Sequence, residues 1–199
     1  MKILTISDIL VKELDKEFDP SIFEDIDLII SCGDLPPEYL TKVMALVKAP
    51  LFYIKGNHDI RYQSKPPQGC LSIHSQIIKF NGYKILGFDG SNWYNGGPNQ
   101  YTDQQMKRMI GRLRASIWLN KGIDIVVTHA PPRYVGDADD RCHMGFESFR
   151  KLITKYKPDY LVHGHIHRNF ESDHDRITDF EGTKVVNACG YYIFNTEQL

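Results

Sequence analysis

The chain has 199 residues, of which 42% are hydrophobic and 25% are charged, and its formal net charge is −1. This length and composition predict a single domain over residues 1–199 with a substantial buried core. No apolar run approaches the roughly 20 residues of a membrane-spanning helix, and the N-terminus shows no signal-peptide pattern, so we expect a cytoplasmic protein without membrane contact. Because Lys and Arg form no block, nucleic acid is not indicated as a partner, and the oligomeric state stays open.

The first third of the chain is typical of short buried strands that end at polar residues. Strands are predicted at residues 2–7, 27–31 and 51–54, and the Pro36-Pro37 pair opens a predicted helix that runs to Lys48. The residues that follow these three strands are Asp8, Cys32-Gly33-Asp34 and Lys55-Gly56-Asn57-His58-Asp59.

A hairpin, a loop and a helix are predicted in the middle of the chain. Residues 76–80 and 83–88 are predicted to pair around Asn81-Gly82, a dipeptide that favours a two-residue hairpin turn. Residues 90–98 are rich in Gly and Asn and predict a loop. One helix is predicted over residues 102–119, with an apolar side formed by Met106, Met109, Ile110, Leu113 and Ile117.

The last third repeats the pattern of a strand followed by ligand side chains. Strand 123–128 leads into His129, and a helix is predicted over residues 146–156. Strand 159–163 leads into His165 and His167, while His163 at its end is interpreted as a core histidine. The remaining residues are predicted to form antiparallel strands.

These strand ends predict one shared site. In open α/β sheets, ligands bind beyond the carboxyl ends of the strands, because the loops from neighbouring strands converge there. One Asp or His at a strand end is more often a cap or a buried hydrogen-bond partner, but five such segments in one chain favour a metal centre. Mixed imidazole, carboxylate and amide oxygen ligands suit Mn, Fe or Zn better than Mg or Ca.

The motifs resemble those of the calcineurin-like metallophosphoesterase family over nearly the whole chain. The resemblance is carried by Asp8, Gly33-Asp34, Gly56-Asn57-His58-Asp59, His129 and Gly164-His165-Ile166-His167. It implies an α/β fold with four layers, an α/β/β/α sandwich, and a site at one edge of the two sheets.

The resemblance also implies a role for each residue. Two metals are expected, with Mn favoured by the ligand chemistry and Fe or Zn as alternatives. The first metal would be held by Asp8, Asp34 and His167, and the second by Asp34, Asn57, His129 and His165. A metal-bound hydroxide would attack phosphorus, with His58 as the general acid and Asp59 orienting the His58 ring.

The chain departs from the family pattern at the first motif. The usual Asp-x-His reads Asp8-Ile9-Leu10 here, so the first metal lacks one ligand and should bind more weakly than the second. The chain is similar to a bacterial subgroup of the family that lacks this histidine. The usual Gly-Asp-x-x-Asp also reads Gly33-Asp34-Leu35-Pro36-Pro37, so its second acidic residue is either absent or replaced by the shifted Glu38.

Four loop residues are candidates for substrate binding. Arg61, Arg133 and Arg141 follow ligand-bearing strands and are candidates for binding phosphate oxygens, with solvated loop arginines as the equal alternative. His143 is a candidate for reaching the substrate or a metal, against the alternative of a surface histidine.

The sequence therefore predicts a metal-dependent hydrolase of phosphomonoesters or phosphodiesters. A small, nucleotide-like substrate is one candidate, and a small substrate is favoured because the chain has neither a capping domain nor a basic groove that is visible in the sequence. Two alternatives stay open. One is a nuclease, and the other is a non-catalytic binding or scaffold protein on the same fold, comparable to the retromer subunit that resembles these enzymes.

Overall fold

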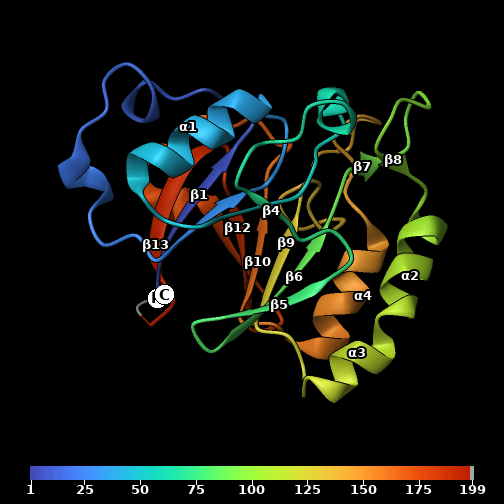
Figure 1. Cartoon of the computed structure of the whole chain (residues 1–199). Helices are drawn as coiled ribbons and strands as arrows, with labels where there is room; N and C mark the ends of the chain where they lie inside the picture. The colour runs from blue at the N-terminus through green and yellow to red at the C-terminus, as the bar shows by residue number, and fades with distance from the viewer. Residues whose placement is uncertain (198–199) are drawn as a thin grey trace.

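Two β-sheets lie face to face in the computed structural model, which describes residues 1–197 (Figure 1). Helix α1 (Pro37–Val47) covers the outer face of one sheet. Helices α2 (Asp103–Arg112), α3 (Arg114–Leu119) and α4 (Glu147–Tyr156) cover the outer face of the other. This order of layers confirms the predicted α/β/β/α sandwich.

The first sheet has the strand order β13-β1-β2-β3-β4. Strands β1 to β4 run parallel, and the last strand of the chain, β13, pairs antiparallel with β1. The bounds are β1 (Lys2–Ser7), β2 (Leu28–Ser31), β3 (Leu51–Tyr53), β4 (Leu71–Ser72) and β13 (Gly190–Asn195).

The second sheet has the strand order β11-β12-β10-β9-β6-β5. Its four inner strands run parallel, and the two edge strands are antiparallel to their neighbours. The bounds are β5 (Ile77–Phe80), β6 (Tyr83–Phe88), β9 (Ile125–Thr128), β10 (Tyr160–His163), β11 (Ile177–Phe180) and β12 (Thr183–Asn187). The smaller elements are β7 (Ser91–Asn92), β8 (Gln100–Tyr101), η1 (Lys12–Leu14), η2 (Pro20–Phe23), η3 (Ile60–Gln63) and η4 (Asp173–Arg176).

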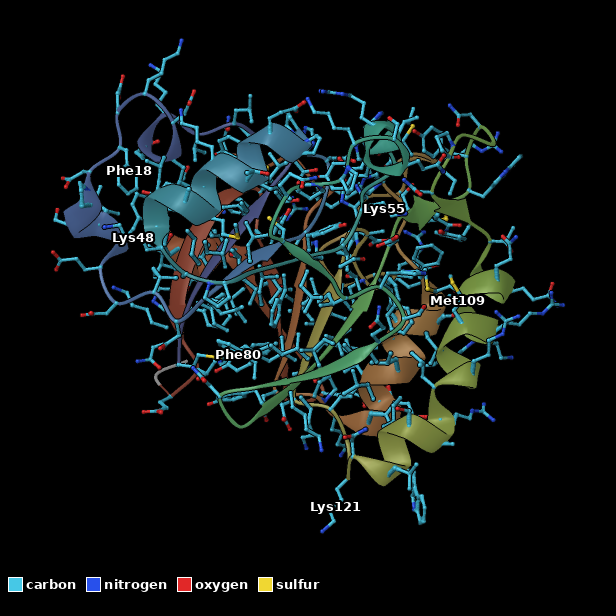
Figure 2. The ribbon with its side chains drawn as sticks, in the orientation of Figure 1. Phe18, Lys48, Lys55, Phe80, Met109 and Lys121 are labelled. Atoms are coloured by element: carbon cyan, nitrogen blue, oxygen red, sulfur yellow. The ribbon has the colours of Figure 1, made fainter. Side chains whose placement is uncertain are left out.

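The strands are apolar on both faces because both faces are covered. Ile3 and Ile30 point between the two sheets, where they pack with residues of the second sheet such as Val127. Their neighbours Leu4 and Ile29 point the other way, towards α1. The side chains of Figure 2 fill the space between the layers accordingly.

The single helix predicted over residues 102–119 is wrong, because the chain forms two helices that meet at Leu113. Leu113 ends α2 with φ −90° and ψ −1°, outside the regular helical values. Gly111, two residues earlier, has a low helix propensity, which lowers the cost of a break at this point. The change of direction still allows Met106, Ile110 and Ile117 to be buried against the second sheet, as their apolar pattern predicted.

Several local predictions are confirmed and one is only half right. The Asn81-Gly82 turn connects antiparallel β5 and β6, with positive φ at both residues. His163 is buried, as interpreted. At the C-terminal end, β11 and β13 are antiparallel to their partners as predicted, but β12 runs parallel to β10. Within residues 1–197, no helix is both long and apolar enough to span a membrane.

Candidate metal centre

The predicted ligands follow five parallel strands, three in the first sheet and two in the second. Their loops meet at one edge of the sandwich, where the His165 backbone amide donates to Asp8. Asp8, Asp34 and His165 have left-handed backbones, with φ of 64°, 57° and 67°. Such conformations are uncommon for residues other than glycine, and backbone strain of this kind clusters at functional sites.

His129 is fully buried, and its hydrogen bonds define which ring nitrogen faces the centre. Its Nδ1–H donates to the carbonyl oxygen of Cys32 at 2.8 Å. Its Nε2 lies 3.3 Å from Oδ2 of Asp34 and 3.0 Å from Oδ1 of Asn57. A backbone partner at Nδ1 is the usual way of leaving Nε2 available as a metal ligand.

His165 joins the same group. Ligand atoms of Asp34, His129 and His165 all lie within 4.8 Å of one another. The imidazole rings of His129 and His165 are tilted, with centroids 4.8 Å apart. His165 Nε2 donates to the carbonyl oxygen of Cys142 at 2.7 Å, so the loop before α4 closes over this side of the centre.

Asp8 and His167 form a second pair beside this group. The His167 Nε2 lies 3.4 Å from Oδ1 of Asp8, and the His167 side chain is 61% exposed while that of Asp8 is buried. The six predicted ligands thus lie in two adjoining sets, one buried around His129 and one open to solvent at His167.

The carboxylates of the centre favour a positive charge at His129 Nε2. Burial alone would lower the pKa of His129, but the carboxylates of Asp34 and Asp8 outweigh burial and raise that pKa to about 9. Burial raises the pKa of Asp34, yet His129 outweighs it and lowers the pKa to about 2. Because Nδ1 already donates to a carbonyl, only an extra proton at Nε2 satisfies the two oxygen acceptors that face it. A divalent metal ion fits the same place, since it supplies positive charge to the same nitrogen and oxygens.

Two motif glycines are required by close approach. A Cβ at Gly56 would collide with the Asp34 carboxylate and lie 2.7 Å from the His129 ring. A Cβ at Gly164 would collide with the Ser7 side chain and lie 2.7 Å from Oδ2 of Asp8. Both glycines therefore allow the ligand loops to approach the carboxylates.

Asp59 does not have the predicted role of orienting the His58 ring in this structure. Its Oδ2 accepts hydrogen bonds from the backbone amides of Gly56 and Asp34, each at 2.8 Å. Within residues 1–197 it makes no hydrogen bond to the His58 ring, whose side chain is exposed. Burial raises the pKa of Asp59 to about 6. Asp59 thus holds the β2 and β3 loops together.

A pocket of about 200 Å³ adjoins the centre at His58. Asp34 and Arg61 both line it, and its walls include apolar side chains. The Arg61 guanidinium is paired with Glu38 at 2.5 Å, and Lys65 contacts the same carboxylate at 3.0 Å. The pocket residues are Asp34, Leu35, Pro36, Pro37, His58, Asp59, Arg61 and Tyr62.

The other predicted substrate residues differ in their surroundings. Arg133 is committed to two carboxylates, donating to Asp137 at 2.7 Å and to Asp139 at 2.9 Å, so it braces its own loop. This arrangement argues against the predicted role in binding phosphate. Arg141 is exposed in the same loop.

His143 lies against the centre. Its ring centroid is 5.3 Å from that of His165, and its Nδ1 is 2.9 Å from Asp140. The structure therefore brings His143 beside a predicted ligand, on the side closed by its own loop.

Leu10 lies on the surface, where 54% of the residue is exposed. Its neighbour Ile9 is exposed as well. The Leu10 side chain is therefore partly open to solvent, and it has no nitrogen or oxygen atom that could bind a metal.

Asp89 was missed, although it carries the same signal as the predicted ligands, an acidic residue at the end of a buried strand. It is buried and accepts from the backbone amide of Lys55 at 2.8 Å. The Lys55 ammonium lies 3.2 Å from the other carboxylate oxygen, and the Asp89 amide donates to His74 at 2.9 Å. This network holds the start of the loop that carries Asn57 and His58.

We expect Asp89→Ala to lower the free energy of unfolding by about 3 kcal/mol, the lower end of the range for breaking a buried ion pair, because Lys55 keeps some contact with water. The Lys55 amide would also lose a partner, which should weaken turnover. Chemical denaturation measures the change. Asp179→Ala removes an exposed carboxylate beside Lys184 and should change stability by about 1 kcal/mol or less. Equal stabilities of the two variants would contradict this role of Asp89.

Two solved structures share the fold of this chain. A crystal structure of TT1561 from Thermus thermophilus has a TM-score of 0.69 at 14% identity, covering 98% of this chain and 94% of that one. A putative 5'-nucleotidase from Staphylococcus aureus, in complex with alpha-ketoglutarate, has a TM-score of 0.57 at 13% identity, covering 98% of this chain and 50% of that one. These identities show a shared fold alone. No curated protein matches the sequence.

The sequence matches the family described as calcineurin-like phosphoesterase over residues 1–169. The matched range contains all five loops of the centre, from Asp8 to His167. The resemblance seen in the motifs is confirmed, and the chain belongs to the calcineurin-like phosphoesterase family.

Proposed function

We propose that this chain is a metal-dependent hydrolase of small phosphomonoesters or phosphodiesters. The observation that carries the proposal is His129, whose buried Nε2 faces the oxygens of Asp34 and Asn57 while its Nδ1 is held by a carbonyl. A purely structural histidine needs no such surplus of acceptors. A bound divalent metal satisfies them and supplies Lewis-acid catalysis and an activated water molecule.

The residues divide into two groups by role. Asn57, His129 and His165 would hold one metal together with Asp34, and Asp8 and His167 would hold a second, with Asp34 as a ligand common to both. His58 is exposed and lines the adjoining pocket, so we assign it to the substrate and not to a metal. From there it donates a proton to the leaving oxygen or stabilises charge on the phosphoryl group.

The pocket beside His58 favours a small substrate. Its volume of about 200 Å³ admits a compact leaving group. If the ion pair between Arg61 and Glu38 opens, the Arg61 guanidinium becomes free to bind a phosphate oxygen. Mn is the metal that we propose first, with Fe and Zn as alternatives, because the ligands mix imidazole with carboxylate and amide oxygens.

We expect hydrolysis of bis(p-nitrophenyl) phosphate to stop on treatment with a chelator and to return when Mn is added. The same cycle with p-nitrophenyl phosphate separates a diesterase from a monoesterase. Metal analysis of the chelator-treated and the Mn-restored protein then shows whether activity follows the metal content per chain. Undiminished turnover by metal-free protein would exclude the mechanism, and metal binding without turnover on any phosphoester would favour the scaffold alternative.

The exposed Leu10 gives a test of the weaker first metal. Leu10→His should place an imidazole near Asp8 and raise the metal affinity of the site held by Asp8 about 10-fold. Even residues that contact metal ligands only indirectly change metal affinity by roughly 10- to 100-fold. Calorimetric titration, with metal counted per chain, measures the effect. Ile9→His is the matched control and should leave affinity unchanged. If both variants behave like the wild type, position 10 points away from the first metal.

A further inference from the structure

Two segments of the chain carry only positive charge. Residues 104–123 and 148–158 contain nine Lys and Arg and no Asp or Glu, so the rest of the chain holds 15 basic and 25 acidic residues. The basic residues are Lys107, Arg108, Arg112, Arg114, Lys121, Arg150, Lys151, Lys155 and Lys157.

The fold gathers these segments on one side of the molecule. They make up most of α2, α3 and α4, which lie together over the outer face of the second sheet (Figure 1). Among the described residues 1–197, only Arg150 of the nine has a carboxylate within 4.0 Å. We call this surface the basic face.

The basic face is hollowed between its helices. One hollow of about 150 Å³ and another of about 350 Å³ share Arg114, Lys155 and Tyr156, so they form a continuous groove. Apolar side chains such as Leu152 and Ile117 contribute to its lining, beside the cations. The surface thus combines apolar area with unpaired positive charge.

Two apolar side chains project from the end of the basic face. Trp118 is 78% exposed and Leu119 is 71% exposed, more than any other large hydrophobic residue described. Ile117 is buried and anchors the helix, so its two neighbours are not needed for packing. In Figure 2, Lys121 lies at the end of the molecule opposite Lys55, which begins the loop of Asn57 and His58. We call Trp118 and Leu119 the apolar tip.

We propose that the basic face and the apolar tip dock the protein onto a bilayer that contains anionic lipids. Trp and Leu side chains enter the boundary between headgroups and acyl chains, and Lys and Arg meet the lipid phosphates. The projecting side chains of Trp118 and Leu119 can enter the apolar interior of a bilayer, because lipids rearrange around them. A nucleic acid would meet the cations with its phosphates but give Leu119 no apolar phase to enter, and an acidic protein segment in the groove would reach Trp118, which lines it, but leave Leu119 in water.

This docking mode leaves the metal centre open to solvent, because the tip and the centre lie at opposite ends. It differs from the expectation of no membrane contact, which rested on the linear sequence and its lack of a spanning segment. The proposal does not rest on catalysis, so its failure and that of the proposed function are separate results.

Sedimentation of the full chain with vesicles tests the proposal. Vesicles of phosphatidylcholine with about 30% phosphatidylglycerol should bind at least about 10-fold more protein than phosphatidylcholine alone, and about 0.5 M salt should reverse the binding. Trp118→Ser with Leu119→Ser should lower binding about 10-fold, and so should Arg114→Glu with Lys121→Glu.

The matched controls are Leu71→Ser and Lys16→Glu, which change an exposed apolar and an exposed basic residue elsewhere. Neither should alter binding. A second measurement leaves the tip intact: in a Trp93→Phe background Trp118 is the only tryptophan, and anionic vesicles should shift its emission to the blue. Brominated lipids should then quench it.

Equal binding to both kinds of vesicle, or binding that the tip variants do not change, would overturn the proposal. An unshifted Trp118 emission in the presence of anionic vesicles would do the same. Retention of a labelled oligonucleotide or of a glutamate-rich peptide, without vesicle binding, would assign the basic face to a different class of partner. Self-association that the charge variant abolishes, again without vesicle binding, would assign it to a second copy of this chain.

Discussion

Replacing Asp34 by Ala should remove metal and activity together. Asp34 Oδ2 lies 3.3 Å from His129 Nε2, and Asp34 Oδ1 accepts a hydrogen bond from the backbone amide of His58 at 2.8 Å. Asp34 therefore lies between the proposed metal ligands and the proposed general acid, His58. Because Asp34 is the proposed ligand of both metals, loss of its carboxylate should weaken both sites. We expect turnover to fall by at least on the order of 10³-fold.

Metal content per chain and hydrolysis of the aryl phosphodiester are measured on the same preparation. Asp173→Ala, which changes an exposed carboxylate in η4, is the control and should match the wild type in both. An Asp34→Ala protein that is folded and keeps two metals per chain would show that Asp34 is not their shared ligand.

His58→Ala should separate activity from metal binding. The His58 side chain is exposed at the pocket, and only its backbone amide, which alanine retains, contacts Asp34. We therefore expect turnover to fall by about 10²–10⁴-fold, the range for a lost general acid, with metal content close to that of the wild type.

The leaving group distinguishes proton donation from simple binding. A nitrophenolate leaves without protonation, so His58→Ala should harm its release less than that of an alkoxide from an alkyl ester. His174→Ala, at an exposed position in η4, should change neither rate. If His58→Ala strips the metal, then His58 is a ligand, and the proposed division of roles is wrong.

The local pattern of the sequence was enough to predict the main strands and the positions of the ligand loops, whereas the four layers were implied by the family resemblance. Buried strands can be recognised from short apolar runs, and the Asp, Asn and His residues that follow them match the family motifs in their order along the chain. The Asn81-Gly82 turn and the apolar side of residues 102–119 are likewise local. The break at Leu113 was not predicted, because the apolar pattern continues through it.

The partners of the polar side chains depended on the tertiary structure. Asp59 and Arg133 looked available for catalysis and substrate binding, but loop closure gives Asp59 two backbone amides and gives Arg133 two carboxylates. Asp89 was overlooked for the same reason, because its role depends on a hydrogen bond from Lys55, which lies 34 residues away in the chain. Hydrogen bonds are short and directional, so small changes in loop position decide between partners that the sequence presents as equals.

The candidate ligands and the family could be predicted from contiguous motifs, and the family resemblance then implied the fold class. Which candidates meet, and where charge accumulates, depends on contacts between segments that are far apart in the chain. The nine cations of the basic face are scattered among apolar residues along the chain, and no run of them stands out. They form one surface because α2, α3 and α4 bury their apolar sides against the same sheet and leave the cations facing water.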